Sequence, residues 1–98
     1  MNFRSRKLLD LAHRVTECQS CGAFCLQGAE PAHENGVEAG KGFGIKSQDN
    51  RHAALCHDCH ASYDQGKGTK EEKAELWNRA HKRTMDLYWK NGWLKVAA

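Results

Sequence analysis

The chain has 98 residues, a formal net charge of +3 and five cysteines. A chain of this length forms one domain with a marginal hydrophobic core, so a bound metal would contribute a meaningful part of its folding free energy. Its apolar runs are far shorter than the ~20 residues that cross a bilayer, which excludes a membrane-spanning helix. We therefore expect a single soluble domain over residues 1–98, and the small charge alone gives weak support for nucleic-acid binding.

The first element that the sequence predicts is a short amphipathic helix over residues 5–15. Leu8, Leu11 and Val15 recur at helical spacing, and Ser5 is a suitable N-cap. This helix would deliver the chain directly to the first of two Cys-x-x-Cys pairs.

The two Cys-x-x-Cys pairs, at residues 18–21 and 56–59, are the strongest signal in the chain. Each turn can present two thiolates to one ion, so Cys18, Cys21, Cys56 and Cys59 can complete the tetrahedral shell that zinc prefers in structural sites. The alternatives are disulfides, unliganded buried cysteines or a thiol redox function, all of which the odd cysteine count and the two tight pairs disfavour. Cysteines reserved for metal are typical of a reducing cytosol. The leftover Cys25 is expected to be a small buried hydrophobe or a substitute ligand.

The middle of the chain, residues 30–66, predicts two strands followed by a helix. The first strand is expected around residues 32–34, and the second over residues 52–55. Between them, residues 36–47 are rich in glycine and contain two lysines, a composition that permits close backbone approach to a ligand such as phosphate. A plain hairpin connection explains this composition equally well. A short helix is expected from His57 to about residue 65.

The last predicted helix, over residues 69–91, has the clearest boundaries. Thr69 followed by Glu72 forms a capping box, and Asn91-Gly92 ends the helix. Its apolar face is expected to contain Ala74, Trp77, Ala80, Thr84, Leu87 and Tyr88. Trp89 and Trp93 are expected to fold back onto the core, with a surface for base stacking or dimerisation as the alternative.

Taken together, these residues resemble a known family. Ala32-His33, the glycine-rich segment, the run 46–49, the run 55–60 and Asp64 are similar in order and spacing to the zinc-containing HNH endonucleases of the ββα-metal superfamily. The likeness is closest to the small nucleases of lambdoid phages and prophages. It implies an α+β fold, namely a small zinc-bound ββα-metal (HNH) domain with flanking N-terminal and C-terminal helices.

The resemblance also implies roles for individual residues. His33 would be the general base that takes a proton from the water attacking phosphorus, and His60 would ligate a catalytic divalent ion (Mg²⁺, Mn²⁺ or Zn²⁺). Asp64 lies one helical turn beyond His60 and would complete the metal shell or support it. Asp49 would orient His33 or contact the metal. HNH enzymes often place a metal-binding aspartate or histidine directly before the base, where this chain has Ala32.

Other roles are open for the histidines of this region. His60 could be a spare zinc ligand beside the second cysteine pair instead of a ligand of the catalytic ion. His52 is either a weaker catalytic candidate or a residue of the strand surface. His13 and His81 lie in predicted helices outside the motif and are expected to be incidental.

The function that the resemblance implies is a metal-dependent endonuclease that hydrolyses phosphodiester bonds in DNA, in phage or prophage recombination or DNA processing in the cytoplasm. Lys41, Lys46 and Arg51 are the expected DNA contacts, and phage or host recombination proteins are candidate partners. The alternative is a non-catalytic zinc-binding module that contacts nucleic acid or another protein, because Ala32 cannot bind a metal.

Overall fold

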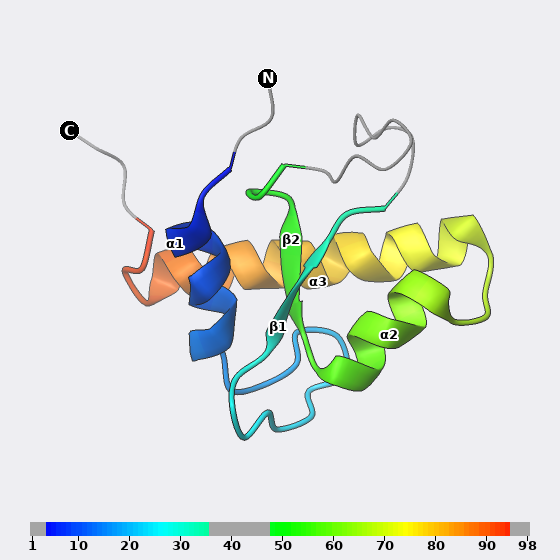
Figure 1. Cartoon of the computed structure of the whole chain (residues 1–98), viewed down its shortest axis with the longest axis horizontal. Coiled ribbons are helices and arrows are strands. Elements are labelled where there is room, and N and C mark those ends of the chain that lie inside the picture. Colours follow the sequence, from blue (N-terminus) through cyan, green and yellow to red (C-terminus); the bar gives the residue numbers. More distant parts are fainter. Residues whose placement is uncertain (1–3, 36–47, 95–98) are drawn as a thin grey trace.

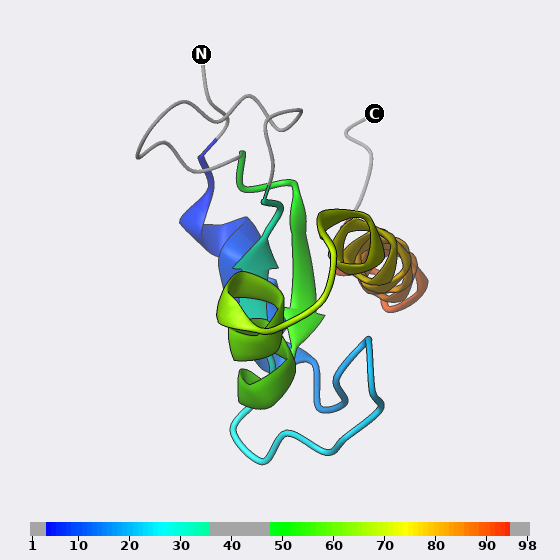
Figure 2. The same cartoon turned by 90° about the vertical axis from the view of Figure 1, so that its right-hand side faces the viewer.

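The computed structural model describes residues 4–35 and 48–94 of the chain, which form a small α+β arrangement around a two-stranded antiparallel hairpin (Figure 1). Its elements are α1 (Arg6–Asp10), the 3-10 helix η1 (Leu11–Arg14), β1 (Glu30–His33), β2 (His52–Leu55), α2 (His57–Gln65) and α3 (Lys70–Lys90). Figure 2 shows the hairpin between α3 on one side and α1 and α2 on the other. No helix among the described residues combines the length and apolarity needed to span a bilayer.

The N-terminal helical segment is shorter and less regular than the sequence predicts. Ser5 caps α1 by accepting a hydrogen bond from the Leu8 N–H, as expected, but the helix changes to 3-10 geometry after Asp10. Val15 then adopts an extended conformation and its carbonyl accepts a hydrogen bond from the Ala29 N–H. The backbone bond to Ala29 therefore replaces the next helical turn and directs the chain toward the first cysteine pair.

The hairpin pairs β1 with β2 in a register that places Glu30 opposite Leu55 and His33 opposite His52. The alanines at the centre of the hairpin are fully buried, and Leu55 packs with them in the core. Because Cys56 follows β2 directly and begins α2 as its N-cap, the strand carries the chain straight into the second cysteine pair.

Helix α3 holds both strands from one side. Its capping box between Thr69 and Glu72 is present as predicted, and its buried face consists of Trp77, Ala80, Thr84 and Tyr88. The Trp77 indole donates a hydrogen bond to the Ala32 carbonyl at 2.9 Å, and Thr84 Oγ1 accepts one from the Ala54 N–H at 3.0 Å. These two bonds attach the hairpin to α3 through backbone groups of the two strands.

The two C-terminal tryptophans, Trp89 and Trp93, lie in different environments. Trp93 packs against the core and stacks under the Arg14 guanidinium, whose Cζ lies 4.2 Å from the ring centroid. Trp89 is 49% exposed, so the expectation that it folds back onto the core was wrong. Tyr88 occupies the core-facing position of this turn, and the next residue along an α-helix points about 100° away from it.

Candidate functional site

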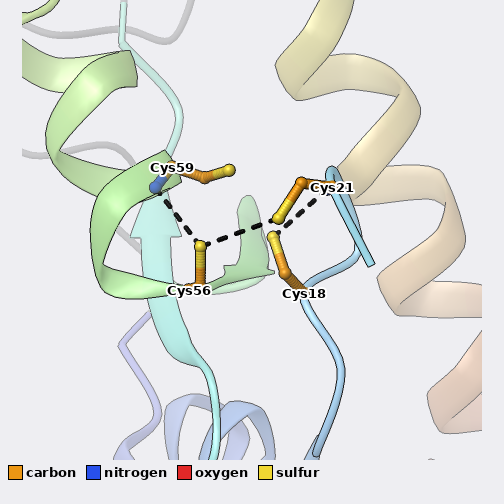
Figure 3. Close-up of side chains that lie close together, drawn as sticks. All are labelled: Cys18, Cys21, Cys56 and Cys59. Carbon is orange, nitrogen blue, oxygen red and sulfur yellow. Dashed lines mark hydrogen bonds between the residues drawn. The ribbon is translucent and has the colours of Figure 1, made fainter. Parts of the chain in front are cut away.

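The four paired cysteines come together in space (Figure 3). Cys18 and Cys21 lie in the turn after η1, Cys56 and Cys59 lie at the start of α2, and their sulfur atoms all lie within 4.8 Å of one another. The Cys21 and Cys56 sulfurs are 3.9 Å apart. A tetrahedral zinc site with Zn–S bonds of about 2.3 Å places its sulfurs about 3.8 Å apart. The cluster can therefore hold a structural metal such as zinc.

Backbone N–H groups point at sulfurs in the cluster and favour the thiolate form of Cys18. The N–H groups of Ser20 and Cys21 both point at Cys18 Sγ at 3.4 Å, and the Cys59 N–H points at Cys56 Sγ at the same distance. Burial opposes ionisation of Cys18, but such backbone hydrogen bonds outweigh it and lower its pKa to about 7. Burial and the neighbouring sulfurs raise the pKa of Cys59. A cation among the four sulfurs would relieve their mutual repulsion, so the donor set fits a thiolate-bound metal.

Cys25 lies outside this cluster. It is buried, its sulfur contacts the Ala23 carbonyl at 3.6 Å, and it packs in the hydrophobic core. Burial, with a smaller contribution from the charges of Cys18 and Cys21, raises its pKa. A protonated buried thiol is neither a metal ligand nor a nucleophile, so Cys25 behaves as the small buried hydrophobe that the sequence predicts. All five cysteines are free of disulfides.

The second candidate feature is the imidazole of His60 on α2, which lies between two carboxylates. Its Nδ1 is 2.8 Å from Glu30 Oε1, and its Nε2 is 3.3 Å from Asp64 Oδ2. The contact with Asp64 follows from the helical spacing that the sequence shows. Glu30 comes from β1, and no local signal identified it because only the folding of β1 against α2 brings it to His60. Both ring nitrogens face carboxylates rather than the sulfur cluster, so His60 is not a spare ligand of the four-cysteine site.

The third candidate feature is the pair formed by His33, at the end of β1, and Asp49. His33 Nε2 lies 2.9 Å from Asp49 Oδ1. The same carboxylate accepts hydrogen bonds from the Ser5 N–H at 2.7 Å and from Arg4 Nη1 at 3.1 Å. Burial opposes ionisation of Asp49, but these three donors outweigh it and lower its pKa. Asp49 is therefore a buried carboxylate that is hydrogen-bonded to the ring of His33.

His33 and His60 belong to separate hydrogen-bond networks. Over residues 4–35 and 48–94, the four-cysteine cluster is the one group of three or more histidine, cysteine, aspartate or glutamate side chains whose ligand atoms converge. The pairs His33–Asp49 and His60–Asp64 thus do not form a single ligand cluster. Ala32, which directly precedes His33, is fully buried and supplies no ligand. The catalytic roles of these residues stay predictions.

His52 is fully buried, so its interpretation as a strand-surface residue was wrong. Its Nδ1 lies 2.7 Å from the Asp49 carbonyl, which can only accept, so Nδ1 carries the proton. Burial lowers the pKa of His52, and the neutral ring accepts at Nε2 the proton of the Tyr88 hydroxyl at 2.9 Å. His81, which lies outside the motif, has a structural role: it donates to the His52 carbonyl at 2.7 Å and stacks on Trp77 with ring centroids 4.8 Å apart.

The predicted DNA contacts are only partly described. Lys41 and Lys46 lie outside the described residues. Arg51 donates through Nε to Glu34 at 2.8 Å, and its Cζ lies 5.2 Å from the Trp77 ring centroid. The ion pair with Glu34 raises the pKa of Arg51. Arg51 is therefore held in place by protein groups, and a contact with DNA stays a prediction.

Comparison of the chain with protein-family models, with curated proteins and with solved structures found no match. The function must therefore be argued from the chemistry of the site itself.

Proposed function

We propose that this chain is a metal-dependent endonuclease that hydrolyses phosphodiester bonds in DNA with an HNH-type site. The observation that carries the proposal is the pairing of His33 with Asp49 at 2.9 Å. A histidine with one nitrogen held by a buried carboxylate and the other directed elsewhere is the arrangement that general-base catalysis needs. The four-cysteine cluster supports the proposal because a structural zinc site is a feature of the zinc-containing HNH endonucleases that the sequence resembles.

The chemistry assigned to His33 follows from its tautomer. The ionised Asp49 can only accept, so a neutral His33 donates Nε2–H to it and carries its lone pair on Nδ1. Among the described residues, no hydrogen bond reaches this Nδ1. The Nδ1 lone pair would take the proton from a water molecule that attacks phosphorus, and the Asp49 carboxylate would stabilise the imidazolium that forms.

His60 and Asp64 are the residues that would hold the catalytic cation. Their facing atoms, Nε2 and Oδ2, are 3.3 Å apart, which fits two ligands of one ion. When bound, a divalent ion neutralises a nonbridging phosphate oxygen and stabilises the departing oxyanion. A nitrogen and a carboxylate oxygen suit Mn²⁺ or Zn²⁺ well and Mg²⁺ less well, with water and phosphate oxygens as the other ligands.

The setting of this activity comes from the resemblance of the sequence to phage nucleases. We propose DNA as the substrate, with Lys41, Lys46 and Arg51 as contacts and with phage or host recombination proteins as partners. A reducing cytoplasm would keep the cysteines available for zinc.

A cleavage assay tests the proposal. Purified, zinc-loaded protein is incubated with supercoiled plasmid and with single-stranded DNA in Mg²⁺, Mn²⁺ or added Zn²⁺. We expect nicking that falls by about 10²-fold or more in His33→Ala, because general bases contribute that much. His13→Ala, an exposed histidine of η1, is the matched control and should cleave like the wild type. Cleavage that persists in His33→Ala refutes the role of His33.

The second candidate function is a non-catalytic zinc module that binds nucleic acid or protein. It is favoured by one observation: Asp49 also binds Arg4 and the Ser5 N–H, so the His33–Asp49 pair equally serves to fasten the N-terminal segment to the hairpin. DNA binding by a folded, zinc-loaded protein without cleavage in any of the three metals would support this module and refute the nuclease.

A further inference from the structure

The carboxylates of Glu30 and Asp64 lie at different distances from the two ring nitrogens of His60. Glu30 Oε1 is 2.8 Å from Nδ1, which is the length of a charge-assisted hydrogen bond of about 2.7–2.9 Å. Asp64 Oδ2 is 3.3 Å from Nε2, longer than the usual N–H···O range of about 2.7–3.2 Å. Adjacent ligands of one cation with bonds of about 2.0–2.1 Å are separated by about 3.0–3.4 Å. The Nδ1 edge therefore has the length of a hydrogen bond, and the spacing at the Nε2 edge is one that two ligands of a single cation also have.

Both carboxylates are themselves held in place. The other oxygen of Glu30 lies 3.1 Å from His57 Nδ1. The other oxygen of Asp64 accepts a hydrogen bond from Asn35 Nδ2 at 2.8 Å, which leaves Oδ2 facing His60. The side chains of His60 and Asp64 are 28% and 40% exposed, so the pair is not sealed from solvent. A ligating carboxylate whose second oxygen is hydrogen-bonded is typical of metal sites.

From this geometry we propose that Glu30 is a positioning residue for the cation site: it accepts the Nδ1–H of His60, fixes that tautomer, and so presents the bare Nε2 beside Asp64 Oδ2 as two ligands of one divalent ion. The carboxylate–histidine–metal arrangement orients the ring and raises the basicity of the ligating nitrogen. Glu30 and Ala32 both belong to β1. Ala32 has no ligand atom, so in this proposal β1 contributes to the metal site only indirectly, through the hydrogen bond from His60 to Glu30. The inference rests on the cation site of the proposed function, but it concerns binding and does not require cleavage.

Binding of Mn²⁺ to the full-length, zinc-loaded protein tests the inference. Mn²⁺ prefers oxygen and nitrogen ligands to thiolates, so it probes the His60 site without displacing zinc. We expect Glu30→Ala to weaken Mn²⁺ binding, measured by titration calorimetry or by electron paramagnetic resonance, by about 10–100-fold. Glu30→Gln should lose less, because its amide oxygen still accepts the Nδ1–H. Asp58→Ala removes an exposed carboxylate from the same helix and is the matched control with unchanged affinity.

The tautomer of His60 gives an independent readout. Long-range ¹H–¹⁵N spectra of the metal-free wild type, recorded where His60 is neutral and with zinc still on the cysteines, should show the proton on Nδ1. This measurement needs no variant and so decides the matter even if Glu30→Ala fails to fold. A proton on Nε2, an Mn²⁺ affinity that Glu30→Ala leaves unchanged, or the absence of Mn²⁺ binding overturns the inference.

The inference and the proposed function fail in distinguishable ways. Mn²⁺ binding that depends on Glu30, with no DNA cleavage in any metal, upholds the inference and refutes the nuclease. Cleavage that depends on His33 while Mn²⁺ binding ignores Glu30 upholds the nuclease and refutes the inference.

Discussion

Removal of the metal from the four-cysteine cluster should unfold or severely destabilise the domain. Cys21 and Cys56 are 35 positions apart in the chain, and their sulfurs lie 3.9 Å apart. Cross-linking a loop of that size lowers the entropy of the unfolded chain by an amount worth about 4 kcal/mol. The whole folding free energy of a natural domain is about 5–15 kcal/mol. The hydrophobic core cannot easily compensate, because much of it consists of alanine side chains, each of which removes little apolar surface from water.

Thermal unfolding of the zinc-loaded and the chelated protein, followed by circular dichroism, measures this effect. For a domain of this size about 1 kcal/mol shifts the Tm by about 4–8 °C, so chelation should lower it by at least about 16 °C or abolish the cooperative transition. Zinc content by mass spectrometry should be close to one ion per chain in the wild type and in Cys25→Ala, and it should fall in Cys56→Ala. A chelated protein with an unchanged Tm, or a folded wild type without metal, would refute the reasoning.

Three further outcomes follow from individual contacts. Gly28 has a φ of +90°, and an added Cβ would overlap the backbone carbonyl of His13. Gly28→Ala should therefore destabilise the zinc-loaded protein by at least about 2 kcal/mol, measured by urea unfolding, and a variant as stable as the wild type would contradict this. Tyr88→Phe leaves His52 Nε2 buried without its donor and should cost about 1–3 kcal/mol in the same assay, and a cost near zero would disprove the buried hydrogen bond. Burial lowers the pKa of His52 in the folded chain. Below a pH of about 6.5, the unfolded chain therefore binds a proton at this residue that the folded chain does not bind. As the pH drops below that value, the free energy of unfolding should fall by up to about 1.4 kcal/mol per pH unit. His52→Gln should lose this share of the slope, whereas equal slopes in zinc-saturated wild type and variant would exclude His52 as the group responsible.

Local signals in the sequence predicted most of the secondary structure. The capping box at Thr69 and Glu72 marks the start of α3 because those two residues satisfy each other's backbone groups without help from the rest of the fold. The spacing within each Cys-x-x-Cys pair likewise predicts a turn that presents two thiolates, and the structure brings the two turns together. Features of this kind depend on residues a few positions apart, which is the range over which sequence patterns are informative.

Contacts between distant segments were not predictable in the same way. Glu30 reaches His60, and Tyr88 reaches His52, only because β1, β2, α2 and α3 pack against one another. A strand of four residues is too short for alternation to reveal which face is buried, so the burial of His52 could not be read from it. The prediction that Trp89 packs on the core was wrong for a related reason: a helix end rich in aromatic residues cannot bury all of them on one face.

Strand β2 connects the two parts of the candidate site and is held at both of its ends. At its start, His52 donates to the Asp49 carbonyl and accepts from Tyr88 of α3, so the backbone that carries the partner of His33 is anchored to the core helix. At its end, the chain enters the cysteine cluster at Cys56, and His60 follows one helical turn later, with its N–H donating to the Cys56 carbonyl. Strand β2 is therefore one of the links between the His33–Asp49 pair and the His60–Asp64 pair, and its two ends are fixed independently, one by a buried hydrogen bond and the other by the cysteine cluster. Loosening either end changes the separation of the two pairs without removing any residue from them, and this is the physical reason to expect metal binding at the cysteines and the geometry of the histidine pairs to be coupled.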